Sequence, residues 1–360
     1  MIQCFIENYL ANYKNYKDKW NYEDGCVLKG AEDLYKVTKD ENYYEFIYKY
    51  MTESIDSDGS IRNYNMEDYN IDNINSGKVL FGLYEKTKDI KYRKAMDALY
   101  TQLKSHPRTE SGGFWHKKIY PHQIWLDGLY MAQPFYIQYE ILVNNRKSYK
   151  DTFNQFMNVR KLLRNSEKEL YYHGCDESRQ EVWASKETGV SACFWGRAMG
   201  WYVMALIDVL EKIPKDLLFE YEQLILVFKE AIDGLLKYQD RQTGMWYQVI
   251  DQGEREGNYL EASATLMMAY TLLKGARLGF LPRGYKEYGK HAFQGTIEKY
   301  LIATGDKFIL DGICGVAGLG NTPYRDGSYE YYISEQIIEN DPKGVGALMM
   351  AYSEMLLLEK

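Results

Sequence analysis

The feature that most constrains this chain is a helical pattern of apolar residues that recurs along almost its whole length. Apolar side chains return at i, i+3, i+4 and i+7, whereas sustained alternation of apolar and polar residues is hard to find. The pattern predicts about a dozen helices, at residues 2–15, 25–38, 41–56, 73–87, 90–105, 122–142, 147–164, 196–213, 217–238, 259–278, 284–300 and 343–358. The fold is therefore predicted to be all-α.

The helices come in pairs, because turn signals such as Lys39-Asp40, Lys88-Asp89 and Ile213-Pro214-Lys215 separate them. A single helical hairpin cannot bury its own apolar face, so hairpins that repeat roughly every 50–60 residues are expected to stack on one another. Six hairpins would close an (α/α)6 barrel, and an open α-solenoid is the competing arrangement.

Four long segments between helices favour the closed barrel. They are rich in Gly, aromatic and charged residues and follow alternate helices, so they would gather on one face of a ring and build a cleft there. No linker rich in Pro or Ser divides the chain, which is predicted to be one domain over residues 1–360. The segments are 106–121, 165–195, 239–258 and 301–342.

Composition narrows the possible partners. The chain is 46% hydrophobic and 26% charged, as expected of a globular protein, and its formal net charge is −7 without any block of Lys and Arg. Nucleic acid and anionic membrane surfaces are bound chiefly by positive charge, so neither is expected as a partner. No run approaches the roughly 18 apolar residues of a membrane span. We expect a monomer or a weak homo-oligomer.

Cysteine and histidine usage points to a reduced compartment and no metal. The five cysteines form no CxxC pair, and the five histidines show neither HExxH nor i,i+4 spacing. The first residues, Met1 to Lys14, contain neither a basic region nor an uninterrupted apolar run of the kind that marks a secretory signal. We therefore predict a cytoplasmic protein without cofactor or metal ion.

The densest polar and aromatic stretch runs from His106 to Pro134 and contains Asp127. On the predicted helix this acid is surrounded by apolar and aromatic side chains, and such surroundings favour the neutral, proton-donating form of a carboxyl group. A buried structural Asp bonded to the backbone is the alternative. The neighbours are Ile124, Trp125, Leu126, Leu129, Tyr130 and Met131.

A second stretch, Tyr172 to Tyr202, places Arg197 between Phe194-Trp195 and Trp201-Tyr202. Tryptophan faces stack on sugar rings and an arginine fork pairs with a carboxylate, so this arrangement suits an acidic sugar. The alternative is an amphipathic helix start with core aromatics and a surface Arg. His173, in a Tyr-His-Gly turn, is either a ligand contact or a loop histidine.

Two further features are less specific. Asp72 stands at a predicted helix N-terminus, where an Asp commonly acts as a cap. The segment from Gly315 to Tyr332 has the Gly density of a flexible lid and a Tyr-Arg-Asp cluster at its centre, but its sequence does not distinguish a lid from a fixed wall. Neither GxGxxG after a strand nor GxSxG is present.

These segments resemble the unsaturated rhamnogalacturonyl hydrolases of glycoside hydrolase family 105, relatives of the family 88 unsaturated glucuronyl hydrolases. The likeness rests on GGFWHKKIYPHQIWLDGLYM, HGCDES, FWGRAMGWY and NTPYRDGSYEYY, with WNYEDGCVLKG near the start. It extends in order over most of the chain, and it implies an (α/α)6 barrel that needs neither metal nor nucleotide.

The resemblance also implies roles for individual residues. Asp127 would be the general acid/base, and Asp72 would be a second acid that helps to hold the substrate and the catalytic group. Tyr22, in the WNYEDG segment, would contact the substrate. Further pocket or cleft residues would be His116, Lys117, Trp125, His173, Trp195, Arg197 and Trp201.

The implied reaction removes a terminal 4,5-unsaturated uronic acid from pectin-derived rhamnogalacturonan oligosaccharides that a lyase has cut. Asp127 would protonate C4 of the double bond and water would attack C5, which differs from hydrolysis between two flanking carboxylates. The alternatives are the same chemistry on unsaturated glucuronyl or other uronyl disaccharides, a non-catalytic binder of acidic sugars, and a helical scaffold for protein partners.

Overall fold

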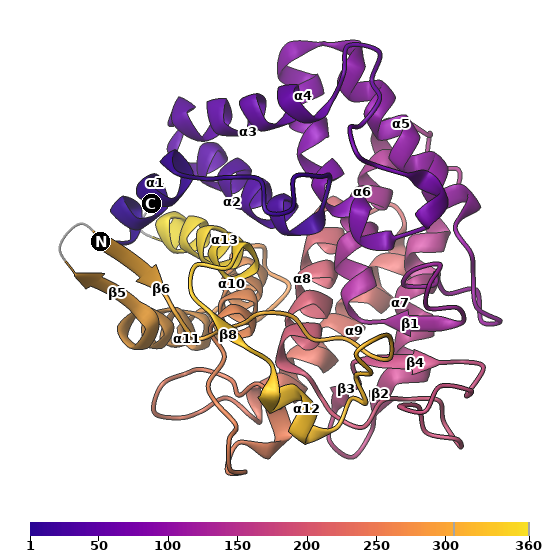
Figure 1. Cartoon of the computed structure of the whole chain (residues 1–360), viewed down its shortest axis with the longest axis vertical. Coiled ribbons are helices and arrows are strands. Elements are labelled where there is room, and N and C mark those ends of the chain that lie inside the picture. The colour runs from indigo at the N-terminus through magenta and orange to yellow at the C-terminus, as the bar shows by residue number, and fades with distance from the viewer. Residues whose placement is uncertain (305–306, 359–360) are drawn as a thin grey trace.

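A computed structural model describes residues 1–304 and 307–358, and its inner helices form a closed ring. Within these residues six elements contact one another in sequence order, and the last of them packs against the first (Figure 1). They are α2 (Tyr22–Thr38), η2 (Ile71–Val79) continuing into α4 (Leu80–Thr87), α6 (Asp127–Leu142), α8 (Gly196–Lys212), α10 (Ala262–Arg277) and α13 (Pro342–Leu358). The closed ring excludes the open solenoid.

The outer helices complete six hairpins among the described residues. Each one precedes its inner partner in the chain, and most also pack against the inner helix before them. They are α1 (Ile2–Ala11), α3 (Glu41–Ser54), α5 (Ile90–Ser105), α7 (Tyr149–Leu163), α9 (Leu218–Leu236) and α11 (Tyr285–Tyr300). The predicted all-α (α/α)6 barrel is confirmed.

Two of the predicted turns use the same local chemistry. Lys39 and Lys88 adopt left-handed conformations, with φ of 62° and 57°, and end α2 and α4. Asp40 and Asp89 then accept hydrogen bonds from the backbone N–H two residues later and so cap α3 and α5. The dipeptide Lys-Asp thus closes one helix and opens the next.

Some helix boundaries differ from those predicted. The helix expected over 73–87 begins as the 3-10 helix η2, and the one expected from 122 begins at Asp127, because residues before it pair as a strand. The short antiparallel pairs are β1 (Gln123–Trp125) with β4 (Gly174–Asp176), β2 (Arg164–Asn165) with β3 (Leu170–Tyr171), β5 (Leu301–Thr304) with β6 (Lys307–Leu310), and β7 (Ile313–Cys314) with β8 (Ile337–Ile338). The remaining short helices are η1 (Met66–Asp68), η3 (Ile250–Gln252) and α12 (Tyr329–Ser334).

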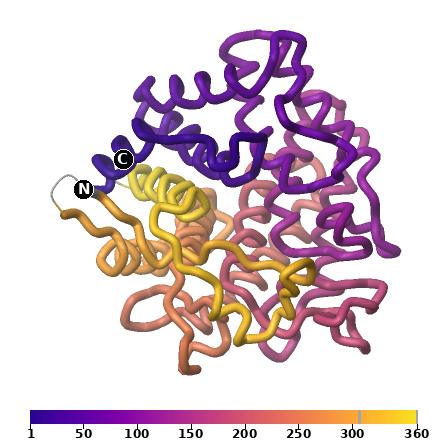
Figure 2. The backbone as a smooth tube through the Cα atoms, viewed as in Figure 1, coloured from indigo at the N-terminus to yellow at the C-terminus, as the bar shows by residue number. Residues whose placement is uncertain are grey.

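One large cluster of buried apolar side chains contains residues from every inner and outer helix. A second, small cluster lies apart from it and consists of Tyr120, Trp125, Trp183, Ala184 and Leu319. In Figure 2 the chain after β6 crosses in front of the ring and reaches the segment that holds β1 and β4. In residues 1–304 and 307–358, no helix has the length and apolar character required to cross a membrane.

Candidate active site

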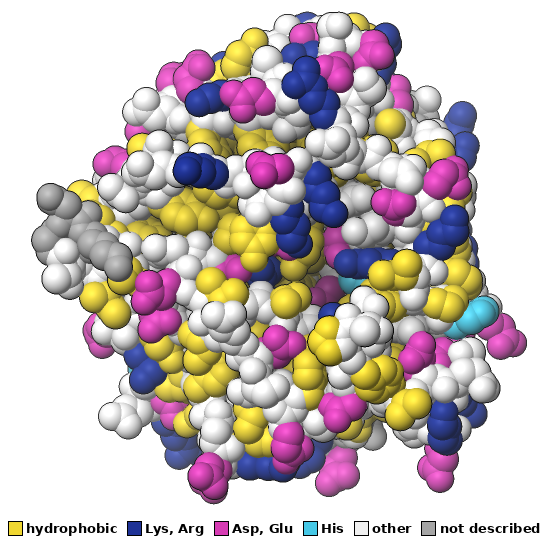
Figure 3. Space-filling view, in the orientation of Figure 1, with side chains coloured by type: hydrophobic (Ala, Val, Ile, Leu, Met, Phe, Trp, Pro, Cys, Tyr) yellow, Lys and Arg dark blue, Asp and Glu magenta, His cyan; other side chains and the backbone are white. Residues whose placement is uncertain are grey.

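The N-terminal ends of the inner helices meet at one end of the barrel. Asn75 of η2 donates to the carbonyl of Tyr22 at the start of α2 (2.9 Å), and Arg197 of α8 donates to Ser263 Oγ of α10 (2.9 Å). Because helix N-termini carry partial positive charge, this end of the barrel favours an anionic ligand. Figure 3 shows a hollow near the centre of this face, with histidine and acidic side chains at its bottom.

Asp127 is the first residue of α6, at this end of the barrel, and 13% of its side chain is exposed. Its Oδ2 lies 3.3 Å from Nε2 of the fully buried His173, and neither atom has a hydrogen-bond partner among the described residues. Oδ2 is thus buried against His173, and the exposed part of the side chain is what a substrate or a water molecule can reach.

The strand pair in front of α6 fixes the distance between these two residues. β1 and β4 are antiparallel, and the N–H of Leu126 donates to the carbonyl of His173 (3.0 Å). The other ring nitrogen of His173, Nδ1, lies 2.7 Å from the hydroxyl of Tyr332 on α12. The imidazole is thus held between Tyr332 and Asp127.

Asp72 lies in the first turn of η2 but does not cap it. The cap is Asn70, whose side chain accepts from the N–H of Asp72 (3.1 Å). This leaves the Asp72 carboxylate free to pair with Lys117 Nζ at 2.7 Å, and His116 Nε2 lies 3.6 Å away.

The two cation-forming side chains beside Asp72 differ in charge. Burial disfavours the Lys117 ammonium, but the charge and hydrogen bond of Asp72 outweigh it and raise the Lys117 pKa above its ordinary value. Burial, followed by the charge of Lys117, lowers the pKa of His116 well below its ordinary value despite the opposing charge of Asp127. The site therefore holds a lysine cation and a neutral His116.

Aromatic rings form two walls around these groups. On one side His116 stacks on Trp125 and Trp125 on Tyr120, with ring centroids 4.2 Å and 4.8 Å apart. On the other side Trp195 packs against His173 at 4.7 Å and stacks on Tyr332 at 5.9 Å. Such faces suit the C–H surface of a sugar ring.

The segment 315–332 rests on the first wall. Arg325 and Asn321 both donate to the hydroxyl of Tyr120, at 2.8 Å and 3.0 Å, and Leu319 packs into the small cluster with Trp125. The predicted Tyr-Arg-Asp cluster thus contributes an arginine to the edge of the site. In the described conformation the segment is a wall.

Arg197 lies at the same end of the barrel and is held by other parts of the chain. Its guanidinium is 1% exposed, pairs with Glu261 (3.3 Å) and donates to Ser263 and to the carbonyls of Cys314 and Gly315. Burial disfavours this cation, yet Glu261 raises the Arg197 pKa above its ordinary value. A contact between Arg197 and a substrate carboxylate stays a prediction.

Two further predicted site residues, Trp201 and Tyr22, lie on the inner helices α8 and α2. Trp201 is 1% exposed and stacks on Tyr130 of α6 (4.7 Å), which puts it in the packing between α6 and α8. Tyr22 is half-buried at the start of α2, and burial together with the nearby charges of Glu23 and Asp72 raises its pKa well above the ordinary value. Trp201 is thus farther from solvent than predicted for a pocket residue.

Three neighbours of the site were not predicted. Tyr120 and Tyr332 lie in segments that the sequence singled out, HKKIYP and NTPYRDGSYEYY, but nothing in the pattern separates them from the other tyrosines. No sequence pattern indicated that Glu261 would lie near the site, because its partner Arg197 is 64 residues earlier in the chain. Within the described chain, no three His, Cys, Asp or Glu side chains are arranged to hold a metal ion.

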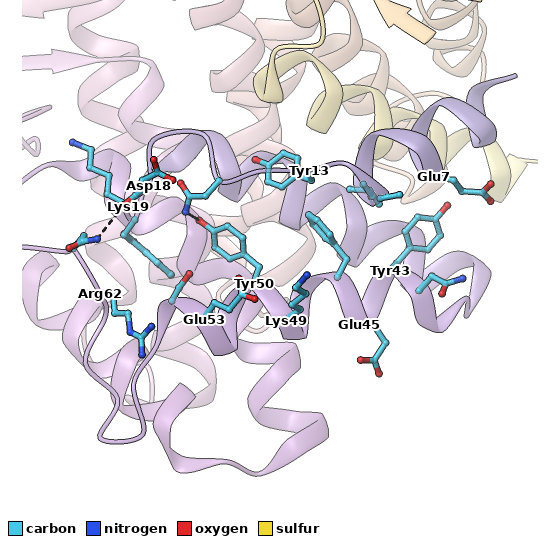
Figure 4. Close-up of a pocket in the computed structure, with 18 of the residues that line it drawn as sticks. Glu7, Tyr13, Asp18, Lys19, Tyr43, Glu45, Lys49, Tyr50, Glu53 and Arg62 are labelled. Carbon is cyan, nitrogen blue, oxygen red and sulfur yellow. Dashed lines mark hydrogen bonds between the residues drawn. The ribbon is translucent and has the colours of Figure 1, made fainter. Parts of the chain in front are cut away.

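A large cavity lies elsewhere. It measures about 900 Å³ and runs between α1, the segment after it and α3, where Figure 4 shows Tyr13, Tyr43 and Tyr50 along its length. Two hydrogen bonds fix the hydroxyl of Tyr50 in this groove, since it donates to Asp24 (2.7 Å) and accepts from Asn15 (3.1 Å). None of the predicted site residues lines this groove.

Comparison with known proteins places this site in a family. The model of Glycosyl Hydrolase Family 88 matches residues 2–358. The chain is 39% identical over 238 residues to Protein Atu3128 of Agrobacterium fabrum, which covers 64% of this chain and 100% of that protein. It is 24% identical over 268 residues, 72% of each protein, to the unsaturated rhamnogalacturonyl hydrolase YesR of Bacillus subtilis.

Solved structures of glycoside hydrolases share the fold of this chain. A family 105 glycoside hydrolase from C. acetobutylicum ATCC 824 superposes with a TM-score of 0.95 at 47% identity over 98% of both chains. The unsaturated glucuronyl hydrolase of Bacillus sp. GL1 shares the fold, with a TM-score of 0.63 at 16% identity over 92% of this chain and 93% of that one. The family match over residues 2–358 makes this protein a glycoside hydrolase. The chain belongs to Glycosyl Hydrolase Family 88.

Proposed function

We propose that this enzyme releases the terminal 4,5-unsaturated uronic acid from lyase-generated rhamnogalacturonan oligosaccharides, with Asp127 as its general acid and base. The observation that carries the proposal is the state of the two acids. Asp72 is paired with Lys117 at 2.7 Å, whereas Asp127 is 13% exposed and has His173 3.3 Å from its buried Oδ2. One available carboxyl group suits protonation of a double bond better than it suits a mechanism with two flanking carboxylates.

In the proposed reaction protonated Asp127 donates its proton to C4 of the C4=C5 bond, and positive charge develops at C5. The Asp127 carboxylate then takes a proton from water as the water oxygen bonds to C5, which restores the acid. The product is a hemiketal, whose ring opens and releases the next sugar. His173 would hold the Asp127 carboxyl group in place, since it is itself held by Tyr332 (2.7 Å).

The charge of the site supports an acidic sugar. Lys117, charged because of Asp72, stands beside the helix N-termini, and together they favour the uronic carboxylate. Trp125, His116 and Trp195 would hold the sugar ring between the two aromatic walls. We propose that Arg197 and Trp201 act through other residues, and that Tyr22 lines the mouth.

The choice of rhamnogalacturonan rests on YesR, which is named as an unsaturated rhamnogalacturonyl hydrolase. The second candidate is the same reaction on another unsaturated uronide. It is favoured by a relative from Formosa agariphila, an unsaturated 3S-rhamnoglycuronyl hydrolase that is 25% identical over 246 residues.

The test follows the absorbance of the conjugated double bond. Purified protein should abolish this absorbance in an unsaturated rhamnogalacturonan disaccharide, and Asp127→Asn should lower kcat by at least about 1,000-fold with an unchanged melting temperature. Asp176→Asn is the matched control, because Asp176 lies on the same strand pair and only orders its own loop. Binding of the disaccharide without any loss of absorbance would identify a sugar-binding protein. Equal rates for the wild type and Asp127→Asn would remove Asp127 from the mechanism.

A further inference from the structure

A second, smaller cavity lies at the opposite end of the barrel from Asp127. It measures about 240 Å³ and is lined by residues from the C-terminal parts of the inner helices. Its lining carries six Lys or Arg side chains and five Asp or Glu side chains, an unusual density of charge for the interior of a helical ring. Lys36 and Glu211 at its edge are 55% and 38% exposed, so the cavity is open to solvent.

Most of these charges are paired. Lys274 lies 2.7 Å from Asp208 and 2.8 Å from Glu211, and its ammonium also meets the hydroxyl of Tyr270. Lys36 pairs with Glu32 at 2.8 Å. Paired groups of this kind need no further ligand.

Three buried atoms of the lining have no hydrogen-bond partner among the described residues, and one partly exposed lysine has no ion pair there. Lys78 Nζ, in a side chain that is 5% exposed, lies 3.2 Å from the ring centre of Tyr130 but donates to no acceptor. Lys212 forms no ion pair within 1–304 and 307–358. Asp33 Oδ2 and Asp208 Oδ2 are buried oxygens that receive no hydrogen bond. Leaving a buried polar atom without a partner is destabilising, so three such atoms that line one cavity call for a ligand.

From this arrangement we propose that the cavity binds a small anion that also carries a hydroxyl group, such as a hydroxy acid or hydrogen phosphate. The anionic oxygens would accept from Lys78 and Lys212, neither of which forms an ion pair among the described residues. The hydroxyl group would donate to the free oxygen of Asp208 or Asp33, which an anion without a proton would repel. One ligand would thus satisfy donors and acceptors that the chain leaves unmatched.

The protonation of the lysines agrees with an incomplete site. Burial lowers the pKa of Lys78 well below its ordinary value, with only partial compensation by Asp208. Burial and the charges of Lys29 and Lys36 lower the pKa of Lys212. An anion between the two ammonium groups would oppose both effects.

The test compares matched pairs of anions by calorimetry at constant ionic strength. Malate should bind at least about tenfold more tightly than succinate, which lacks the hydroxyl group, and hydrogen phosphate more tightly than sulfate. Lys78→Met should abolish binding while still packing on Tyr130. Lys49→Met, which removes the same charge from the outer groove, should leave binding unchanged.

Three results would overturn the proposal: no saturable binding, which would leave water as the occupant; equal binding of malate and succinate; and binding that survives in Lys78→Met. If Lys78→Met does not fold, crystals of the wild type soaked in malate replace it. Density in contact with Lys78 would support the site, and a cavity that contains only water would refute it. The site is independent of the proposed reaction, since malate binding requires no activity.

Discussion

The contacts of Arg197 lead to a prediction that separates a structural role from a substrate-binding one. Arg197→Met removes a fully buried cation from Glu261, which is itself 0% exposed. Glu261 keeps three donors, namely Ser263 Oγ and the backbone N–H groups of Ala264 and Cys314. Breaking a buried ion pair costs about 3–5 kcal/mol of unfolding free energy. Because Glu261 keeps these donors, we expect a loss near the lower end of that range.

This loss is measurable in the intact enzyme. Unfolding entropy of about 2.1 cal/mol/K per residue over 360 residues converts 3 kcal/mol into a fall in Tm of about 4 °C. The assay is thermal and urea unfolding followed by circular dichroism, with kcat and KM measured on the same samples. Arg160→Met, which breaks a pair at a residue that is 48% exposed, is the control and should cost less than about 1 kcal/mol.

A double variant tests the pairing itself. In Arg197→Met/Glu261→Gln no buried charge remains unpaired, so it should be at least about 1 kcal/mol more stable than the sum of the two single variants predicts. The reasoning is refuted if Arg197→Met unfolds within about 0.5 kcal/mol of the wild type and its KM rises about 100-fold. That result would indicate that Arg197 binds a substrate carboxylate.

Three further predictions concern the mouth of the barrel and its supports. Tyr332→Phe removes one hydrogen bond of about 1–1.5 kcal/mol from His173, so kcat should fall about tenfold with KM unchanged. An unaltered kcat would mean that Tyr332 only packs. Lys117→Met leaves the Asp72 carboxylate unpaired and should lower kcat/KM at least about 100-fold, whereas Lys117→Arg should retain more activity. His106 is buried with its pKa lowered to about 4, mainly by burial, so the unfolded chain binds the extra proton between pH 6.5 and 4 and stability should fall by up to about 3 kcal/mol across that window. Urea titrations should show a flatter dependence in His106→Gln, and the same slope in both proteins would contradict this.

The fold could be predicted from the sequence because helix periodicity and turn chemistry are local. Lys39-Asp40 and Lys88-Asp89 each close a helix and cap the next within two residues. The boundary at Asp127 was missed because residues 123–125 pair with a strand about 50 positions later, and no periodicity records such a partner. The 3-10 geometry of η2 was missed for a related reason: its residues are buried between α2 and α6.

The site could be predicted only in part. The sequence located the segments that meet at the mouth, and the structure brings Asp127, His173, Asp72 and Lys117 together there. It could not reveal which side chains are already satisfied, since that depends on partners far along the chain. The pairing of Arg197 with Glu261 is one such case, and the sequence pattern did not indicate it.

The parallel direction of the inner helices explains why the two ends of the barrel differ in chemistry. At the end where the helices begin, free N–H groups favour anions, so a single lysine beside Asp72 is enough to direct an acidic sugar toward Asp127. At the other end exposed carbonyl groups favour cations, which accounts for lysines near the helix ends there. Lys78 does not fit that explanation, because its ammonium donates to no carbonyl or carboxylate. The helix termini explain most of the lysines in the second, smaller cavity. Lys78 is a lysine that they do not explain, and it therefore calls for a ligand.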